Sequence, residues 1–251
     1  MQTALVTGAS SGIGEQFARQ LSARGDELIL VARRQDRLEQ LAGELPSPAH
    51  IVPCDLATEA SSLAGKVAEL GLEVDLLVNN AGFGTYGKFV EIEPKRDADQ
   101  VRVNCEAVVT LTHAFLPAML QRDRGGVIVV ASTAGMQPLP YEAVYSASKA
   151  FALNFTEALS GELRGSGVRV LAVNPGPVPT EWQRVAGHDD VAIVPGEIPA
   201  EQVVREALAA YDRGRRSIIP GRRMRWVMRA THAPRSIQLR VAERLYRPGR
   251  G

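Results

Sequence analysis

Tyr145 and Lys149 are the pair of side chains in this chain of 251 residues whose types and spacing most clearly suggest chemistry. They stand four residues apart in a segment with helical periodicity, so they share one face of a helix. An ammonium group beside a phenol stabilises the phenolate and lowers the tyrosine pKa from its usual value of about 10. Such a tyrosine can exchange a proton with an alcohol or a carbonyl near neutral pH. The same spacing also arises by chance, and a tyrosine in a helix is often a core residue.

Ser132 precedes Tyr145 by thirteen residues and ends a predicted strand. Its hydroxyl can donate a hydrogen bond to a substrate oxygen at the edge of a sheet, although such a serine alone is more often a plain strand-end hydroxyl. Lysine is rare in this chain, which has 25 arginines and only four lysines. A lysine at the position of Lys149 is therefore less often a chance occurrence. The three side chains together suggest a proton-transfer site.

A glycine-rich turn follows the first predicted strand and leads into a helix; it reads Thr7-Gly8-Ala9-Ser10-Ser11-Gly12-Ile13-Gly14. The glycines permit a tight turn and a close approach of the backbone to a pyrophosphate, which the N–H groups at the helix N-terminus would bind. The position between a strand and a helix is the context that such a motif requires. Its G-x-x-x-G-x-G spacing differs from the G-x-G-x-x-G of the commonest dinucleotide-binding motif. The alternative interpretation is a glycine-rich turn with a purely structural role.

Arg33 and Arg34 follow the second predicted strand, where a nucleotide-binding α/β fold places the adenosine ribose. An acid there would favour NAD through the 2′-hydroxyl, whereas an arginine pairs with the 2′-phosphate of NADP. We therefore predict NADP (NADPH) as the cofactor, with Arg33 as the principal contact. The alternative is two surface arginines at the start of a helix. Asp55 and Leu56, after the third strand, are predicted to flank adenine, although Asp55 also suits a helix start.

The elements that must position these residues are short apolar runs that alternate with helical patterns. The runs are rich in Val, Ile and Leu without strict alternation, as strands buried on both faces are; they are Ala4–Thr7, Glu27–Ala32, His50–Pro53, Asp75–Val78, Gly126–Ala131, Val168–Val173 and Ser217–Ile219. The helical segments are Gly12–Arg24, Gln35–Leu45, Glu59–Leu70, Lys95–Gln121, Val144–Gly165 and Ala200–Arg213. Because this alternation implies right-handed crossovers, we predict an α/β fold: a Rossmann-type, doubly wound, parallel seven-stranded sheet with helices on both faces.

Composition excludes several classes of protein. With 45% hydrophobic and 23% charged residues, the chain is unlike disordered, collagen-like or coiled-coil sequences. Two cysteines and four scattered histidines predict neither a disulfide framework nor a metal site. No stretch reaches the roughly 18 apolar residues of a membrane span, and the first residues lack the pattern of a signal peptide. We expect a cytoplasmic protein with one domain over residues 1–251, its core at about 2–220 and a basic helical extension at about 221–251.

The order of these motifs resembles that of the short-chain dehydrogenases/reductases, over about residues 2–220. The glycine-rich turn looks like the cofactor motif of that family, and Asn79-Asn80-Ala81-Gly82 looks like its NNAG motif. Its catalytic tetrad is matched by Asn104, Ser132, Tyr145 and Lys149. The segment Pro175-Gly176-Pro177-Val178-Pro179-Thr180 is similar to its nicotinamide-side motif.

The resemblance implies a carbonyl–alcohol oxidoreductase on a hydride-carrying cofactor. Tyr145 would be the general acid in reduction, Lys149 would lower its pKa and hold the nicotinamide ribose, and Ser132 would bind the substrate oxygen. Asn104 would position a water that links Lys149 to solvent. The remaining implied cofactor contacts are Gly8, Ser10, Ser11, Gly12, Ile13, Gly14, Arg33, Arg34, Asp55, Leu56, Asn80, Ala81, Gly82, Pro175, Gly176, Val178 and Thr180. One departure is Ser11, where some NADP-using members carry a basic residue, so the NADP prediction rests on Arg33 and Arg34.

The walls of the substrate site are expected at Phe83–Tyr86, Ala134–Tyr141 and Trp182–Pro199. Their apolar side chains favour a hydrophobic substrate, and the alternative is that the last segment packs on itself; these side chains are Met136, Leu139, Tyr141, Trp182 and Val185. A different hypothesis of function is a catalytically silent, cofactor-binding regulatory or scaffold protein, which the complete tetrad disfavours. The resemblance also implies a homodimer or homotetramer built through the long helices at 95–121 and 144–165.

The net charge of +1 hides a division of the chain. From Arg213 to Gly251 twelve arginines and one acid give +11, whereas the preceding 212 residues carry −10. We predict two helices in this tail, Arg222–Thr231 and Arg235–Tyr246, the second with Ile237, Val241 and Leu245 in one apolar row. We favour packing of the tail on the acidic body or on a second subunit. Contact with an anionic membrane surface is the less favoured alternative, and no nucleic-acid partner is predicted because no reader motif accompanies the arginines.

Overall fold

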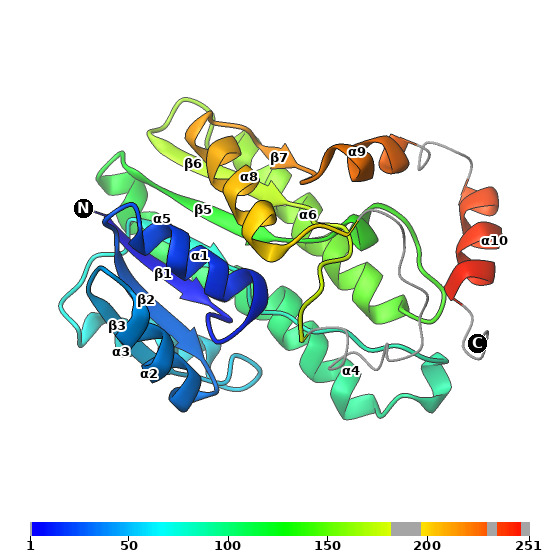
Figure 1. Ribbon diagram of the computed structural model, residues 1–251, viewed down its shortest axis with the longest axis horizontal. Coiled ribbons are helices and arrows are strands. Elements are labelled where there is room, and N and C mark those ends of the chain that lie inside the picture. Colours follow the sequence, from blue (N-terminus) through cyan, green and yellow to red (C-terminus); the bar gives the residue numbers. More distant parts are fainter. Residues whose placement is uncertain (1, 182–196, 230–234, 247–251) are drawn as a thin grey trace.

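Seven strands form one parallel sheet in the computed structural model, which describes residues 2–181, 197–229 and 235–246 (Figure 1). The strand order is β3-β2-β1-β4-β5-β6-β7. The strands are β1 (Thr3–Thr7), β2 (Glu27–Ala32), β3 (Ala49–Pro53), β4 (Leu76–Asn79), β5 (Gly125–Val130), β6 (Val168–Val173) and β7 (Ser217–Ile218). The order reverses between β1 and β4, so the predicted doubly wound, Rossmann-type sheet is confirmed.

Both faces of the sheet are buried, which explains the continuous apolar runs in the sequence. Successive side chains of a strand point to opposite faces. In β1, Ala4 and Val6 pack into the core cluster on one face, and Leu5 packs into the cluster on the other. Both faces therefore take mainly apolar residues, and the strands lose the alternation of half-exposed strands.

Helices cover both faces of the sheet. The first face is covered by α1 (Gly12–Ser22), α2 (Gln35–Glu44) and α8 (Ala200–Asp212). The second face is covered by α3 (Leu63–Ala68), α5 (Ala107–Gln121) and α6 (Ala143–Glu162), with α4 (Pro94–Val101) leading into α5. Short 3₁₀ turns among the described residues are η1 (Ala60–Ser62), η2 (Phe89–Glu91) and η4 (Thr133–Met136). Most predicted bounds agree within two residues, but the helix predicted from Glu59 begins four residues later, after η1.

The segment predicted as one helix over Lys95–Gln121 is interrupted by a π-helical turn, η3 (Arg102–Glu106). Such turns insert one extra residue and re-aim the side chains that they carry, and they are frequent at functional sites. The sequence periodicity does not reveal this turn. It carries Asn104, one of the four predicted catalytic residues, and so decides where that side chain points.

The continuous helical stretch Pro94–Gln121 is the one helix, among the described residues, that is long and apolar enough to cross a membrane. Its packing gives a different explanation of its composition. Val103, Val108 and Leu111 lie in the core cluster on the second face of the sheet. The stretch is therefore a core helix of the sheet layer, whose apolar face is buried by β-strands.

The strand β7 forms one edge of the sheet and has only two residues, Ser217 and Ile218. Within the part of the chain that the structure describes, it pairs with β6 alone. The exposed Arg215 and Arg216 precede it directly, and the buried Pro220 follows two residues later. This edge therefore offers very little regular backbone for pairing.

Two further helices follow the sheet, α9 (Arg222–Arg229) and α10 (Arg235–Tyr246). They confirm the two predicted tail helices; α10 has the predicted bounds, and residues 230–231 of the first prediction lie outside the described residues. The two described members of the apolar row of α10 do not pack against the body. Ile237 and Val241 are 51% and 52% exposed, and nothing is described for the side chain of Leu245. The row that packs inward is Gln238, Ala242 and Tyr246, because Ala242 and Tyr246 join a core cluster in the body.

Candidate active site

A cavity of about 900 Å³ opens at the carboxyl ends of the strands, the edge where open α/β sheets bind ligands. All the predicted site residues line it except Gly14 and Asn104. Segments that are far apart in the sequence therefore converge as predicted. The predicted residues that line the cavity are Gly8, Ser10, Ser11, Gly12, Ile13, Arg33, Arg34, Asp55, Leu56, Asn80, Ala81, Gly82, Ser132, Tyr145, Lys149, Pro175, Gly176, Val178 and Thr180.

The glycine-rich turn has the geometry of a cradle. Gly8 and Gly12 have φ of 67° and 58°, in the left-handed region that favours glycine. Gly14 lies behind the turn: a Cβ built on it would stand 2.2 Å from the carbonyl oxygen of Gly8. Only glycine lets α1 begin so close to the turn, and the N-terminus of α1 consequently faces the cavity.

Asn80 ties the end of β4 to the same turn. Its Nδ2 donates to the carbonyl oxygen of Thr7 at 2.8 Å, and its backbone N–H donates to Thr7 Oγ1 at 3.0 Å. The N–H of Ala81 donates to the same hydroxyl at 3.0 Å. The NNAG-like segment therefore stabilises the glycine-rich turn.

Arg33 and Arg34 differ in their surroundings. Arg34 forms an ion pair with Glu181, Nη1 to Oε2, at 2.9 Å, and its Nη2 donates to Ser10 Oγ at 3.1 Å. Arg33 is exposed, lines the cavity and forms no ion pair within the described ranges 2–181, 197–229 and 235–246. Arg34 thus braces the turn, while the guanidinium of Arg33 stays exposed beside the cavity.

Asp55 serves local structure and also faces the cavity. Its Oδ1 accepts a hydrogen bond from the N–H of Ala57 at 3.0 Å, so the carboxylate caps the turn after β3. Leu56 beside it is buried and lines the cavity too. The alternative interpretation of Asp55, a helix start, is wrong, because the next helical residues are Ala60–Ser62; its adenine-binding role stays a prediction.

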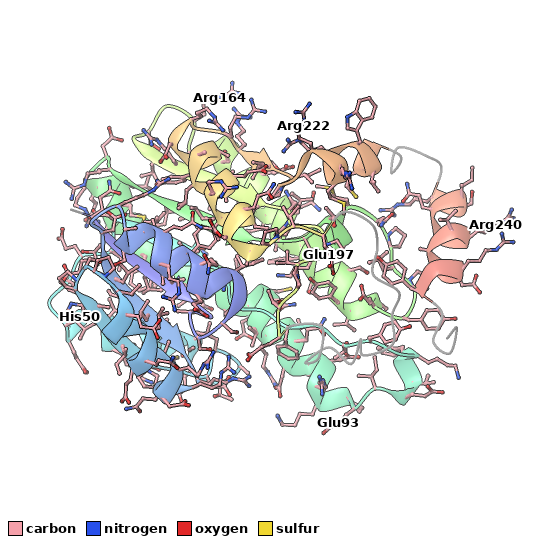
Figure 2. All side chains as sticks on the ribbon, viewed as in Figure 1. His50, Glu93, Arg164, Glu197, Arg222 and Arg240 are labelled. Carbon is pink, nitrogen blue, oxygen red and sulfur yellow. The ribbon has the colours of Figure 1, made fainter. Side chains whose placement is uncertain are left out.

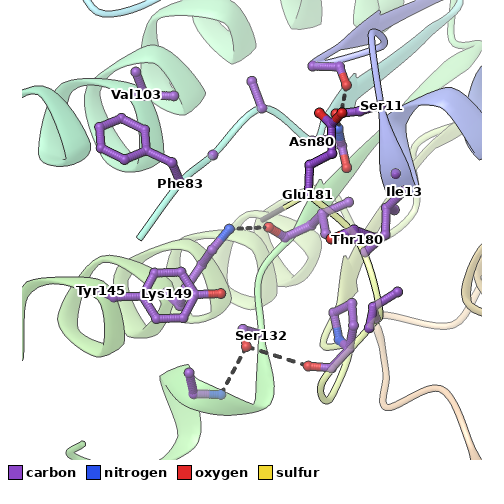
Figure 3. A pocket seen from close by; sticks show the side chains of 18 of the residues that line it. Ser11, Ile13, Asn80, Phe83, Val103, Ser132, Tyr145, Lys149, Thr180 and Glu181 are labelled. Carbon is purple, nitrogen blue, oxygen red and sulfur yellow. Dashed lines mark hydrogen bonds between the residues drawn. The ribbon is translucent and has the colours of Figure 1, made fainter. Parts of the chain in front are cut away.

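Ser132, Tyr145 and Lys149 lie together on one wall of the cavity (Figure 3). Ser132 caps η4, where its Oγ accepts from the N–H of Ala134 at 3.1 Å. Tyr145 and Lys149 project from α6, and both are buried, with 8% and 6% of their surface exposed. A hydrogen bond joins Ser132 to the phenol of Tyr145. A substrate oxygen at this wall would therefore meet two hydroxyl groups.

The expected lowering of the Tyr145 pKa by Lys149 is not found in this structure. Burial, followed by the charge of Glu142, raises the pKa of Tyr145, and the hydrogen bond with Ser132 lowers it. Lys149 Nζ lies 6.0 Å from the centre of the Tyr145 ring and donates to the carbonyl oxygen of Val130 at 2.8 Å. Lys149 is itself desolvated, and burial lowers its pKa to about 8.

Asn104 is buried beside this wall and does not line the cavity. Its Nδ2 donates to the carbonyl oxygen of Phe83 at 2.9 Å and to Ser148 Oγ at 2.9 Å, and its Oδ1 accepts from the N–H of Phe83 at 3.2 Å. These contacts hold the segment after β4 against α6. The implied role of Asn104 in positioning a water stays a prediction.

Sequence reasoning missed Tyr246 and Glu142, which both line the cavity. Tyr246 comes from α10 and packs in one cluster with Leu139 and Tyr145. Its carbonyl oxygen accepts a hydrogen bond from Tyr86 Oη at 2.7 Å, which joins the tail to the segment after β4. The spacing of four between Ala242 and Tyr246 was a usable signal for this packing face, but nothing in the tail indicated its partner.

The predicted substrate walls are present in part. Phe83, Ala134 and Leu139 line the cavity, whereas Met136 and Tyr141 do not. Tyr141 instead adopts a φ of 68° in the turn before α6, where its carbonyl oxygen accepts from the N–H of Gly87 at 2.9 Å. Trp182 and Val185 lie outside the described residues.

Burial of Lys149 makes a prediction about stability. Its pKa of about 8 in the folded chain is below the usual lysine value of 10.5, so folding favours the neutral form. The resulting cost, about 3 kcal/mol, is present below pH 8 and disappears as the pH rises through 10.5. Lys149→Met removes this cost and also the hydrogen bond to Val130, worth about 1 kcal/mol. We expect a melting temperature at pH 7 that is roughly 3 to 6 °C higher, measured by calorimetry.

The control for this stability prediction is Lys95→Met, because Lys95 has 74% of its side chain exposed. That change should leave the melting temperature within about 1 °C, since exposed ion pairs contribute little. A lower melting temperature for Lys149→Met would contradict the prediction.

Comparison with known proteins places this geometry among dehydrogenases. Residues 2–190 match the sequence model of the short chain dehydrogenases. Sulfoacetaldehyde reductase 2 of Chromohalobacter salexigens is 38% identical over 199 residues, which are 75% of this chain and 77% of the reductase. A short-chain dehydrogenase from Sphingobium yanoikuyae in complex with NADPH superposes with a TM-score of 0.82 at 31% identity, over 95% of each chain. One from Burkholderia phymatum in complex with NAD gives 0.82 at 25% identity, also over 95% of each chain.

Proposed function

Since this chain belongs to the short-chain dehydrogenase/reductase family, whose members are oxidoreductases, we propose that it is an NADP(H)-dependent enzyme that interconverts a carbonyl and an alcohol. The observation that carries the proposal is the joint placement of Ser132 and Tyr145 on the wall of a cavity whose other end is the glycine-rich turn (Figure 3). A proton donor and a nucleotide cradle thus share one cavity.

The residues present fit a dinucleotide. The turn at Gly8 and Gly12 and the N-terminus of α1 supply backbone N–H groups for a pyrophosphate, and the Cβ-free surfaces leave room for its close approach. Asp55 and Leu56 would flank the adenine, and Asn80 the ribose next to it. Val178 and Thr180 would meet the nicotinamide carboxamide. When bound, the cofactor supplies or accepts the hydride.

The protein side of the reaction is proton transfer and orientation. In reduction, Ser132 Oγ and Tyr145 Oη donate hydrogen bonds to the carbonyl oxygen, and Tyr145 delivers the proton to it. The raised pKa of Tyr145 keeps the phenol protonated at neutral pH, as a general acid must be. Lys149 would hold the nicotinamide ribose. To do so its ammonium group would leave the carbonyl oxygen of Val130 and would lie closer to the phenolate that develops on Tyr145. Asn104 holds Phe83 and α6 in register beside it.

NADP is the proposed cofactor because of Arg33. Arg34 is engaged by Glu181 and Ser10, so the exposed guanidinium of Arg33 is the group that suits the 2′-phosphate. The NADPH complex of the similar Sphingobium yanoikuyae protein supports this choice. Because the similar Burkholderia phymatum protein was solved with NAD, the preference for NADP over NAD has to be tested by experiment.

The proposed substrate is hydrophobic at the end that lies near Tyr246. Phe83, Ala134 and Leu139 form an apolar lining with the ring of Tyr246 close to Tyr145. Gln137 and Glu142 add polar groups to the same region, so a substrate with one polar substituent would also be accommodated. A cytoplasmic homodimer or homotetramer is proposed, with Val101, Leu120 and Phe151 exposed on the helices that would pair.

The experiment that tests the proposed function is a panel of aldehydes and ketones with NADPH, read by the loss of absorbance of the reduced nicotinamide. Turnover of at least one carbonyl supports an enzyme. Binding of NADPH, measured by calorimetry, without turnover of any member would favour the alternative, a catalytically silent cofactor-binding protein.

Tyr246 makes a second prediction, about specificity. Tyr246→Ala enlarges the cavity beside Tyr145, so the ratio of kcat/KM for a bulky aromatic ketone to that for a small aldehyde should rise about tenfold. Steady-state kinetics with both substrates measures this ratio. The matched control is Tyr86→Phe, which removes the hydroxyl that donates to the carbonyl oxygen of Tyr246 and should leave the ratio within about twofold. A ratio that does not change in Tyr246→Ala would show that this side chain does not limit substrate size.

A further inference from the structure

The helices α9 and α10 carry a surface that the oxidoreductase function does not explain. We call it the tail surface and define it as the exposed side chains of these two helices. Its apolar members make up five of the eleven exposed large hydrophobic residues in the described part of the chain. They are Trp226 (71% exposed), Val227 (48%), Ile237 (51%), Leu239 (42%) and Val241 (52%).

Arginines are interleaved with these apolar residues. The two helices contain seven arginines and a single acid, Glu243. Arg222 and Arg223 on α9, and Arg235, Arg240 and Arg244 on α10, are exposed. Figure 2 shows Arg222 and Arg240 projecting outward from the end of the molecule that carries α9 and α10. The tail surface is therefore both strongly basic and apolar.

The inner faces of the helices fix which way the tail surface points. Met224 and Met228, four residues apart, are the buried side of α9, and Met224 packs against Gly176, where an added Cβ would stand 2.5 Å from its Cε. On α10 the buried side is Ala242 with Tyr246, which packs near Tyr145. The exposed side chains consequently face away from the body, and the predicted packing of the tail on the acidic body accounts only for the opposite faces.

We propose that the tail surface docks onto the surface of an anionic phospholipid bilayer. Short helices that combine a basic polar face with Trp, Ile, Leu or Val lie in the interface of such membranes. Each Lys or Arg near an anionic bilayer adds favourable electrostatic free energy, and tryptophan is enriched at the level of the headgroups. The charge of +11 over residues 213–251 complements such a surface.

The alternative occupant is the acidic body of a second copy, which the charges alone would also suit. The pattern of the tail surface favours lipid. Subunit interfaces gather their apolar residues in a core from which charges are depleted, with a polar rim around it. Here Trp226 directly follows Arg225 in sequence, and Leu239 and Val241 flank Arg240. Among the described side chains of both helices, exposed apolar residues thus have exposed arginines as neighbours in the sequence.

The test uses the full chain and large unilamellar vesicles of phosphatidylglycerol and phosphatidylcholine in equal parts, with pure phosphatidylcholine vesicles for comparison. In co-sedimentation we expect binding to the anionic vesicles at 0.1 M NaCl and weaker binding at 0.5 M, because salt screens exposed charges. Arg222→Glu with Arg223→Glu should reduce the vesicle-bound fraction at least tenfold. The matched control is Arg37→Glu with Arg205→Glu, which makes the same change of charge on α2 and α8 and should retain binding.

Fluorescence provides an independent readout of the apolar contact. The chain has two tryptophans, so Trp182→Phe leaves Trp226 as the single indole. We expect its emission to shift to shorter wavelength when anionic vesicles are added, and to be quenched by brominated acyl chains. Trp226→Ser in the otherwise unchanged protein should weaken co-sedimentation about fivefold or more. Melting temperatures of all variants show whether each is folded.

Three results would overturn the proposal. The first is absence of binding to the anionic vesicles. The second is binding that the change at Arg222 and Arg223 lowers no more than the control does. The third is self-association, measured by light scattering, that the tail variants abolish while vesicles bind none of them; this result would assign the tail surface to a second copy. None of these measurements requires turnover, so they stand apart from the test of the oxidoreductase function.

Discussion

Tyr145→Phe is expected to lower kcat by about a thousandfold or more while NADPH binds with an unchanged Kd. The substitution removes one hydroxyl and keeps the ring that packs against Leu139 and Tyr246. General acid catalysis by a positioned side chain contributes about 10² to 10⁴-fold, and here the lost group also donates a hydrogen bond to the substrate oxygen. Steady-state kinetics and calorimetry with NADPH measure the two quantities separately.

The matched control is Tyr211→Phe, which removes a phenolic hydroxyl that is also buried but lies away from the cavity. Burial raises the pKa of Tyr211 to about 12, so this group too stays neutral at pH 7. Its loss should change kcat by less than about twofold. Residual turnover of more than a few per cent in Tyr145→Phe would contradict the assignment of the proton to Tyr145 and would point to water or Ser132 as the donor.

Arg33→Asp is expected to change the cofactor preference, measured as the ratio of kcat/KM for NADPH to that for NADH, by about a hundredfold or more. An arginine with a phosphate forms charge-assisted hydrogen bonds worth about 1.5 to 3 kcal/mol, and each 1.4 kcal/mol is a factor of ten. Asp at this position would repel the 2′-phosphate and accept a hydrogen bond from the 2′-hydroxyl of NADH.

Arg34→Ala provides the comparison for this change. Since Arg34 is held by Glu181 and Ser10, its loss should affect both cofactors to a similar degree, through the glycine-rich turn, and leave the ratio within about threefold. If the unchanged protein used NADPH and NADH equally well, the proposed role of Arg33 would be wrong. An unchanged ratio in Arg33→Asp would carry the same meaning.

Sequence reasoning was most successful where local pattern and global topology agree. The strands β2 and β6 have the predicted bounds. Their residues, such as Ile29 and Leu171, are fully buried, so each strand appears in the sequence as a short continuous apolar run. The convergence of Gly8, Asp55, Asn80 and Ser132 at one cavity follows from a parallel sheet, in which all carboxyl ends meet at one edge. Family resemblance added the order of the motifs to this physical argument.

Contacts between distant parts of the chain account for what could not be predicted. The hydrogen bond from Tyr86 to Tyr246 spans 160 residues, and no periodicity in either segment encodes it. The ion pair between Arg34 and Glu181 likewise joins two segments that are far apart in the sequence, and no local pattern in either segment indicates it. The surroundings of Lys149 depend on how deeply α6 is buried, which decides that desolvation outweighs the attraction expected from spacing alone.

The very short edge strand β7 has a consequence for colloidal behaviour. A sheet edge with a long row of unpaired N–H and C=O groups is a template for intermolecular β-addition and fibrillar aggregation. Here the edge strand next to β6 is β7, which has only two residues. The charged residues Arg215 and Arg216 directly precede it in the sequence, and Pro220 follows it. Positive charge and proline are devices that suppress such growth. The first arginines of the basic tail thus protect the solubility of the sheet, separately from those on α9 and α10.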